Sequence, residues 1–210
     1  MLFNSLAFLV FLPIVLAVYY TLPRRWQNIW LLAASYFFYG WWNWKFCSLL
    51  AISTIVDYYC GLAMDKEQDD RRRKRILLIS LCTNLGILGF FKYFNFFTGS
   101  AVELMNSIGM KADPVTINII LPVGISFYTF QTLSYTIDIY RRQMRPTKDF
   151  LSFALFVSFF PQLVAGPIER ALRLLPQMQK KREPNGYKIF SGIWLIIFGY
   201  FKKVAIADAV

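Results

Sequence analysis

Histidine is absent from the 210-residue sequence, and charged residues are scarce. Without an imidazole, these residues carry no Ser-His or Cys-His arrangement and no histidine general base. The three cysteines lie in or beside apolar runs with no CxxC spacing, which favours inert thiols over a metal site. Charged residues make up 17% of the chain, whereas ordinary soluble domains carry about 25%. The composition therefore argues against a soluble globular domain.

Apolar residues dominate instead. They make up 57% of the chain, aromatic residues make up 19%, and the mean hydropathy is +0.43. They gather into runs of roughly 20 residues, the length of a membrane crossing. The net charge of +11 comes from short Lys and Arg blocks between these runs, which indicates topology signals rather than nucleic-acid binding. The sequence predicts an all-α, polytopic integral membrane helical bundle that forms one domain over residues 1–210.

The basic blocks predict the orientation of this bundle. Blocks at residues 24–25, 71–75 and 141–148 separate the apolar runs, and the positive-inside rule places them in the cytoplasm. The amino terminus and a loop over residues 98–116 are then expected outside the cytoplasm. A further crossing is expected to begin near Tyr187. The first five apolar runs cover residues 1–22, 26–44, 46–64, 76–97 and 117–140.

The run from Phe150 to Ile168 breaks this alternation because basic residues flank it on both sides. Pro161, Gly166 and Pro167 interrupt it, and proline removes a backbone donor and disfavours helix in the preceding residue. We therefore predict a broken, re-entrant segment that enters and leaves the membrane on the cytoplasmic side. Irregular backbone at membrane depth must be surrounded by protein or a water-filled cavity, so residues 159–170 are a candidate cavity lining.

Polar side chains are unusually dense in the apolar stretch over residues 121–142. Tyr128, Gln131, Tyr135 and Asp138 follow i, i+3, i+7, i+10 spacing, which places them on one helical stripe. Such a stripe faces the protein interior or a pathway rather than lipid. Two interpretations stay open, contact with a substrate cavity and hydrogen bonds that fix helix packing. Asp138 also has the spacing of an ion pair with the arginines three and four residues later.

The sequence thus supplies two sets of candidate residues and no catalytic or metal-binding residue. Arg170 is included because its guanidinium suits an anion such as phosphate or carboxylate, although it also suits a lipid headgroup. The candidate channel or substrate-contact residues are Ser126, Tyr128, Gln131, Tyr135, Asp138, Gln162 and Arg170. The candidate architectural residues are Pro122, Gly124, Pro161, Gly166 and Pro167.

Several ordered motifs support a family resemblance over essentially the whole chain. They read ASYFFYGWW from Ala34, STIVDYYCGL from Ser53, FKYFNFF from Phe91, LPVGISFYTFQTLSYTIDIYR from Leu121 and FFPQLVAGPIER from Phe159. Together they resemble the membrane-bound O-acyltransferase family, in its bacterial branch that O-acetylates polysaccharides such as alginate. The resemblance implies a ring of helices around a thinned, funnel-like centre in the bacterial cytoplasmic membrane.

The resemblance also implies an activity. Such an enzyme moves an acyl group, commonly acetyl, from a cytoplasmic thioester such as acetyl-CoA to hydroxyls of an extracytoplasmic polysaccharide, usually through a separate extracytoplasmic transferase. Members are longer and carry a membrane-embedded catalytic histidine in their later half, so these residues are expected to be an amino-terminal portion without a bound cofactor. Two alternatives are a polytopic transporter or flippase and an inactive fragment with an assembly role.

Overall fold

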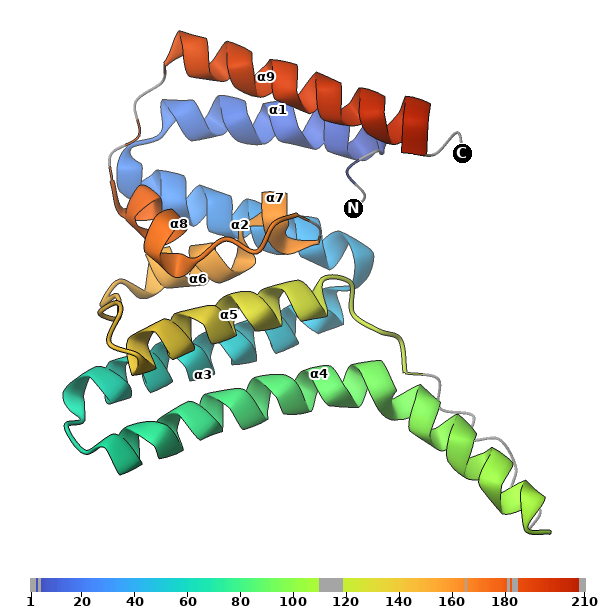
Figure 1. Cartoon of the computed structure of the whole chain (residues 1–210). Helices are drawn as coiled ribbons and strands as arrows, with labels where there is room; N and C mark the ends of the chain where they lie inside the picture. Colours follow the sequence, from blue (N-terminus) through green and yellow to red (C-terminus); the bar gives the residue numbers. More distant parts are fainter. Residues whose placement is uncertain are drawn as a thin grey trace.

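The computed structural model in Figure 1 describes residues 3, 5–109, 119–164, 166–180, 182 and 185–207. These residues form helices and no strand, which confirms the all-α prediction. The helices are α1 (Leu6–Thr21), α2 (Arg24–Asn43), η1 (Trp44–Phe46), α3 (Cys47–Lys66), α4 (Asp70–Ser107), α5 (Ile125–Tyr140), α6 (Phe150–Ser158), α7 (Phe160–Leu163), α8 (Ala171–Gln179), α9 (Gly186–Phe201) and η2 (Lys202–Ala207).

Three helical stretches are long and apolar enough to cross a membrane. They are Arg24–Lys66, Asp70–Ser107 and Gly186–Ala207, and α1 is a shorter apolar helix. Figure 1 shows that the first stretch reverses its direction near η1, so α2 and α3 run in opposite directions. Large apolar side chains are exposed along all of these helices, as expected for a protein whose solvent is lipid. The molecule is therefore an all-α membrane protein.

Two predicted loop boundaries are wrong, both beside α4. The basic block at residues 71–75 lies within the first turns of α4 rather than in a loop, because Asp69 caps the helix by accepting a hydrogen bond from Arg71 N at 3.0 Å and Arg and Lys are good helix formers. At its other end α4 continues to Ser107, through the first part of the loop predicted from residue 98. Of the rest of that loop, residues 110–116 lie outside the described residues.

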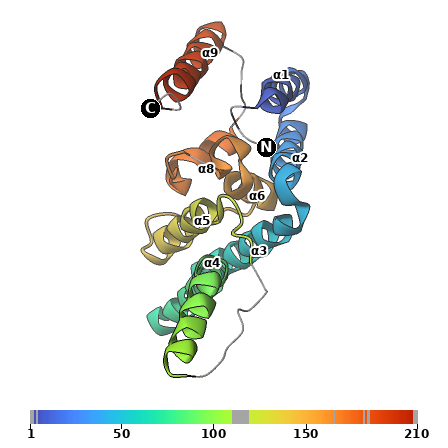
Figure 2. The same ribbon diagram turned by 90° about the vertical axis from the view of Figure 1, so that its right-hand side faces the viewer.

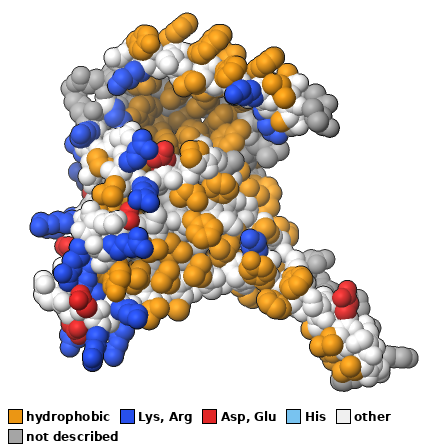
Figure 3. All heavy atoms as spheres, in the orientation of Figure 1, with side chains coloured by type: hydrophobic (Ala, Val, Ile, Leu, Met, Phe, Trp, Pro, Cys, Tyr) orange, Lys and Arg blue, Asp and Glu red, His pale blue; other side chains and the backbone are white. Residues whose placement is uncertain are grey.

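The basic residues gather at one end of the molecule, as the sequence predicted. Figure 3 shows Lys and Arg concentrated at the left of the view, where α2 begins, α4 begins and α5 ends. At that end Arg73 is buried, and its guanidinium donates to the carbonyls of Met64 in α3 and of Ile139 and Tyr140 in α5. It binds backbone acceptors in the last turns of α3 and α5, where helical carbonyls lose their regular partners.

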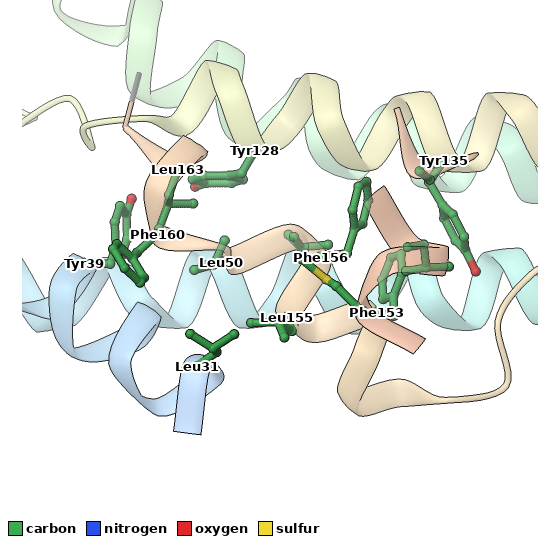
Figure 4. Packing of buried hydrophobic residues seen from close by; sticks show 14 of the residues in the cluster. Leu31, Tyr39, Leu50, Tyr128, Tyr135, Phe153, Leu155, Phe156, Phe160 and Leu163 are labelled. Carbon is green, nitrogen blue, oxygen red and sulfur yellow. The ribbon is translucent and has the colours of Figure 1, made fainter. Parts of the chain in front are cut away.

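The short helix α6 lies at the centre of the bundle. Its residues from Ser152 to Ser158 are all buried, and Figure 2 shows α6 between α2 and α5. A helix that is buried on every side is a core element. Its own Phe153 and Phe156 are among the large buried side chains of Figure 4, together with Leu31 of α2 and Leu50 of α3.

Helix α9 stands apart from this core. None of its residues is buried, and it lies beyond α1 in Figure 1 and away from α6 and α8 in Figure 2. Figure 3 shows a hollow lined with hydrophobic side chains between α9 and the rest of the molecule. Its apolar surface is consistent with a crossing that begins near Tyr187, as predicted from the sequence.

Candidate functional site at the re-entrant segment

The segment from α6 to α8 leaves one end of the bundle and returns to the same end. Asn28 of α2 donates to Ser152 Oγ near the start of α6 at 3.4 Å and to Met178 O near the end of α8 at 3.0 Å. Beside it, Gln179 Nε2 donates to Thr147 Oγ1 at 2.8 Å. Both ends of the segment therefore lie together on the basic end, and the middle is broken at Phe159 and Val164. This is the re-entrant shape that flanking charge and helix breakers predicted.

The break leaves two backbone groups without helical partners, and side chains of neighbouring helices satisfy both. In a continuous helix Phe160 N would donate to Phe156 O. Here Phe160 N donates to Ser35 Oγ of α2 at 3.2 Å, and Phe156 O accepts from Gln131 Nε2 of α5 at 2.7 Å. Buried backbone groups need such partners, above all in lipid. Gln131 thus has a structural role in the break.

Glycine allows α5 to begin directly against this break. Gly124 has φ of 78°, and a Cβ placed on it would collide with the carbonyl oxygen of Leu163 in α7. Gly166 also has positive φ, 142°, where L side chains are strained. Pro122 is buried in the turn before α5, and Pro161 lies in the first turn of α7. Pro167 is exposed after the break.

The polar stripe of α5 is buried against the re-entrant segment. Tyr128, Gln131, Tyr135 and Asp138 are each at most 5% exposed. The Tyr135 ring lies 4.5 Å from the Phe153 ring of α6, and the Tyr128 ring lies 6.4 Å from the Tyr39 ring of α2. Figure 4 shows Tyr128 and Tyr135 projecting from α5 toward α6 and α7. We call this contact the seam.

Several polar atoms in and beside the seam have no hydrogen-bond partner among the described residues. They are the hydroxyls of Tyr39, Tyr128 and Tyr135, Asp138 Oδ2 and Gln162 Nε2. In Figure 4 the hydroxyl end of the Tyr128 ring lies beside Leu163, on the side nearer Tyr39. Buried polar atoms are nearly always hydrogen-bonded. The Tyr39 and Tyr128 hydroxyls are close enough to interact with each other, and the Tyr135 hydroxyl with the backbone of Thr147, so small shifts can pair these three.

A cavity of about 350 Å³ opens beside Tyr39, at the end of the seam away from the basic residues. This is within the usual size range of a small-molecule site. Its lining is mainly aromatic and includes Phe38, Tyr39, Trp41, Trp42, Val123 and Val164. The cavity thus adjoins the break of the re-entrant segment.

The remaining candidate residues are less buried than the stripe of α5. Ser126 and Gln162 are half-buried, and Arg170 is exposed just before α8. The ion pair considered for Asp138 does not form in the described part of the chain. Arg142 instead pairs with Asp70 of α4 at 3.0 Å. Of the predicted set, the structure therefore brings together the four stripe residues on one buried face of α5 and places Gln162 in α7.

Sequence reasoning missed a second buried polar cluster, between α3, α4 and the other face of α5. Asp57 is fully buried and accepts hydrogen bonds from Ser80 Oγ at 2.6 Å and Asn84 Nδ2 at 2.9 Å. Ser80 Oγ also lies 3.2 Å from Thr136 Oγ1 of α5, within hydrogen-bond distance, and Ser53 donates to Asn84. A signal was present, because Asp57 is an ionisable residue within an apolar run. We call this group the Asp57 cluster.

Neither cluster has the composition of a metal centre. Among the described residues there is no group of three or more Cys, Asp and Glu side chains that could hold a metal ion. The described geometry is therefore that of a polytopic helical membrane protein with a buried polar seam around a central re-entrant segment.

Comparison with known proteins identifies relatives of this chain. It is 40% identical to the probable alginate O-acetylase AlgI of Pseudomonas aeruginosa, over 99% of this chain and 40% of that protein. It is 39% identical to the protein of the same name from Azotobacter vinelandii, over 100% of this chain and 42% of the relative. It is 36% identical to a peptidoglycan O-acetyltransferase of Helicobacter pylori, over 99% of this chain and 45% of the relative.

The chain is a homologue of these bacterial O-acetylases, and the resemblance predicted from its motifs is confirmed. It spans less than half the length of each of these relatives. No family model and no solved structure matches it.

Proposed function

We propose that the protein is an O-acyltransferase that moves an acyl group, acetyl by preference, from a cytoplasmic thioester such as acetyl-CoA toward hydroxyls of an extracytoplasmic polysaccharide. The observation that carries this proposal is the identity of about 40% over the whole chain with proteins named for alginate O-acetylation. The relative named for peptidoglycan O-acetylation indicates that the acetyl group is the common element while the glycan differs.

The chemistry assigns different tasks to different parts of the protein. In O-acyl transfer the acyl carbon leaves the thioester sulfur and bonds to a hydroxyl oxygen, while the hydroxyl proton passes to a base and the thiol departs. The site must also keep water from the thioester. These 210 residues contain no histidine, so we assign the base to a further part of the protein and treat the seam as the water-excluding wall.

The seam also supplies a short route between the two sides of the membrane. Helix α5 has 16 residues, which corresponds to about 24 Å, whereas the hydrocarbon core of a bilayer is about 30 Å thick. Helix α6 has nine residues and ends inside the bundle. We propose that the protein is thinned here and that Tyr128, Tyr135, Asp138, Gln162 and the half-buried Ser126 line the route.

The topology follows from the same proposal. The basic end faces the cytoplasm of a bacterium and the thioester, the amino terminus is extracytoplasmic, and the aromatic cavity beside Tyr39 faces the glycan side of the inner membrane. A separate extracytoplasmic transferase would receive the acyl group there. Arg170, exposed near the basic end of α8, is proposed to contact an anionic group of the donor or of a lipid.

A labelling assay tests the function. Inverted membrane vesicles that carry the complete protein and enclose the polysaccharide are supplied with labelled acetyl-CoA outside, and acetyl ester on the enclosed glycan is measured. We expect CoA-dependent labelling that disappears when the protein is omitted. Absence of labelling together with uptake of intact sugar would instead establish a transporter. If acetyl labelling persists when these 210 residues are deleted from the complete protein, their role is in assembly only.

A further inference from the structure

A narrow apolar cavity lies along α1, between this helix and α2, α7 and α8. The cavity measures about 290 Å³. On α1 its lining follows i, i+3, i+4, i+7 spacing over Leu12, Val15, Leu16 and Tyr19, which is one face of a helix over about 10 Å. Leu16 is 40% exposed, so the cavity opens on the surface of the bundle. The cavity therefore extends from the basic end, where α1 ends, to the break of the re-entrant segment at Phe160.

One end of this cavity is charged. Arg182, which is partly buried, lines the cavity beside Gln177 and Tyr19. Its Nε donates to Gln177 O at 3.2 Å, and its guanidinium carbon lies 5.7 Å from the centre of the Tyr19 ring, whose hydroxyl is close enough to interact with it. A guanidinium has five N–H donors, and these two partners use two of them. The contacts therefore hold the guanidinium at the end of the cavity and leave it further donors.

The charge at this end is not balanced by the cavity wall. No acidic residue is among the described residues that line the cavity, and none of their ion pairs includes Arg182. Beyond Arg182, Gln177 and Tyr19, every lining side chain is apolar. The cavity is thus basic at one end and apolar along the rest of its length. A phospholipid has the complementary distribution, an anionic phosphate attached to a hydrocarbon chain, and the fork of a guanidinium matches phosphate oxygens.

We propose that this cavity binds one anionic phospholipid, with its phosphate on Arg182 and one acyl chain along α1. The chain would reach the break and cover Pro161, which is exposed there. A segment of protein fits this cavity less well, because the apolar part of the wall offers no side-chain partner to the polar groups of an irregular backbone. The lipid site does not depend on the proposed acyl transfer, because it is built from the cavity wall and Arg182 alone.

Photolabelling of the complete protein tests this site. The protein is placed in bilayer discs of phosphatidylcholine that contain an increasing minor fraction of phosphatidylglycerol with a photoreactive diazirine in one acyl chain. After irradiation, labelled peptides are identified by mass spectrometry. A lipid bound in the cavity labels α1 and α8 to a level that saturates, whereas lipid that only surrounds the protein labels in proportion to its fraction. No acetyl donor is present, so failure of this site is distinguishable from failure of the acetyl-labelling assay.

Two pairs of variants separate the charged end from the apolar part. Arg182→Gln removes the charge, and its control is Arg173→Gln, at an exposed arginine of α8 outside the cavity lining. Leu16→Trp fills the apolar part, and its control is Leu9→Trp, at a leucine of α1 that is 54% exposed and does not line the cavity. Each pair is read independently, so the test holds if one variant fails to fold.

We expect saturable labelling of α1 and α8 in the unmodified protein and in both controls. The apparent affinity should fall about tenfold or more in Arg182→Gln, because charge-assisted hydrogen bonds to the phosphate are lost. Saturable labelling should disappear in Leu16→Trp. The proposal is overturned if labelling of α1 and α8 never saturates, which is also the result if another part of the complete protein fills the cavity. It is equally overturned if each variant labels like its control.

Discussion

The two faces of α5 both carry buried polar side chains, but they differ in how those side chains are satisfied. Toward α3 and α4, the Asp57 cluster is closed, because Asp57, Ser80 and Asn84 bond to one another and to Thr136. Along the stripe, the hydroxyls of Tyr128 and Tyr135 and one oxygen of Asp138 have no partner with hydrogen-bond geometry among the described residues, and the Tyr135 hydroxyl lies beside Gly61 of α3. The closed face has the properties of a structural joint, and the open face has those of a binding surface.

The largest loss of stability should come from removing the central acceptor of the Asp57 cluster. Asp57→Ala leaves Ser80 and Asn84 without their acceptor in the interior, which should destabilise the fold by about 3 kcal/mol. The measurement is thermal or denaturant unfolding in detergent, with the exposed Asp65→Ala as the control. Equal stability of the two variants would show that the Asp57 cluster is not a joint.

A smaller loss of stability should follow when the hydrogen bond from Gln131 to the Phe156 carbonyl is removed. Gln131→Leu removes the donor to Phe156 O and leaves a buried carbonyl unsatisfied, which should cost about 1–3 kcal/mol. Ser35→Ala should cost a similar amount because it leaves Phe160 N without its acceptor. Unfolding is compared with that of Gln143→Leu, a change at an exposed glutamine. A loss no greater than in this control would contradict the role of Gln131 in the break.

The open face should behave in the opposite way. Tyr128→Phe removes a hydroxyl whose geometry meets no hydrogen-bond criterion among the described residues, so stability should change by less than about 0.5 kcal/mol. If the hydroxyl contacts the transferred group or its carrier, acetyl labelling should fall about tenfold, the effect of one lost hydrogen bond to a charged group. Tyr59→Phe, at an exposed tyrosine of α3, is the matched control. Unchanged labelling with lowered stability would make the seam a second joint.

The smallest effect is expected where polar groups meet in water. Arg142 and Asp70 connect the end of α5 to the start of α4 with 64% and 83% of their side chains exposed. Asp70→Asn should leave the unfolding midpoint nearly unchanged at low and high salt, because exposed ion pairs contribute little. A clear, salt-dependent fall in the unfolding midpoint would show that this pair, like the Asp57 cluster, stabilises the packing of the helices.

The sequence was sufficient for the features that depend on one segment at a time. Apolar run length predicted most of the helices, although α5 begins only at Ile125 within the run predicted over residues 117–140. Flanking charge with Pro161 and Gly166 predicted the re-entrant segment. Spacing predicted that Tyr128, Gln131, Tyr135 and Asp138 share one buried face. The start of α4 was missed because a cap by Asp69 outweighs the polarity of the basic block that follows.

Features that depend on pairing between segments were out of reach. Asp57 is bonded to side chains 23 and 27 residues away, and no periodicity within one helix shows where another helix presents its polar groups. The role of Gln131 in the break depends on Phe156, on a different helix. Whether the seam lines a substrate route stays a prediction, because packing and binding require the same buried spacing.

The break of the re-entrant segment has a consequence for biogenesis. Helix α6 has only nine residues, too few to span a bilayer as an independent unit, and the backbone groups freed at its end cannot be left in lipid. The two side chains that satisfy them, Ser35 and Gln131, belong to helices that precede α6 in the chain. When the ribosome delivers the segment, both partners have already been made, so the order of synthesis matches the order in which this part of the membrane domain can be assembled.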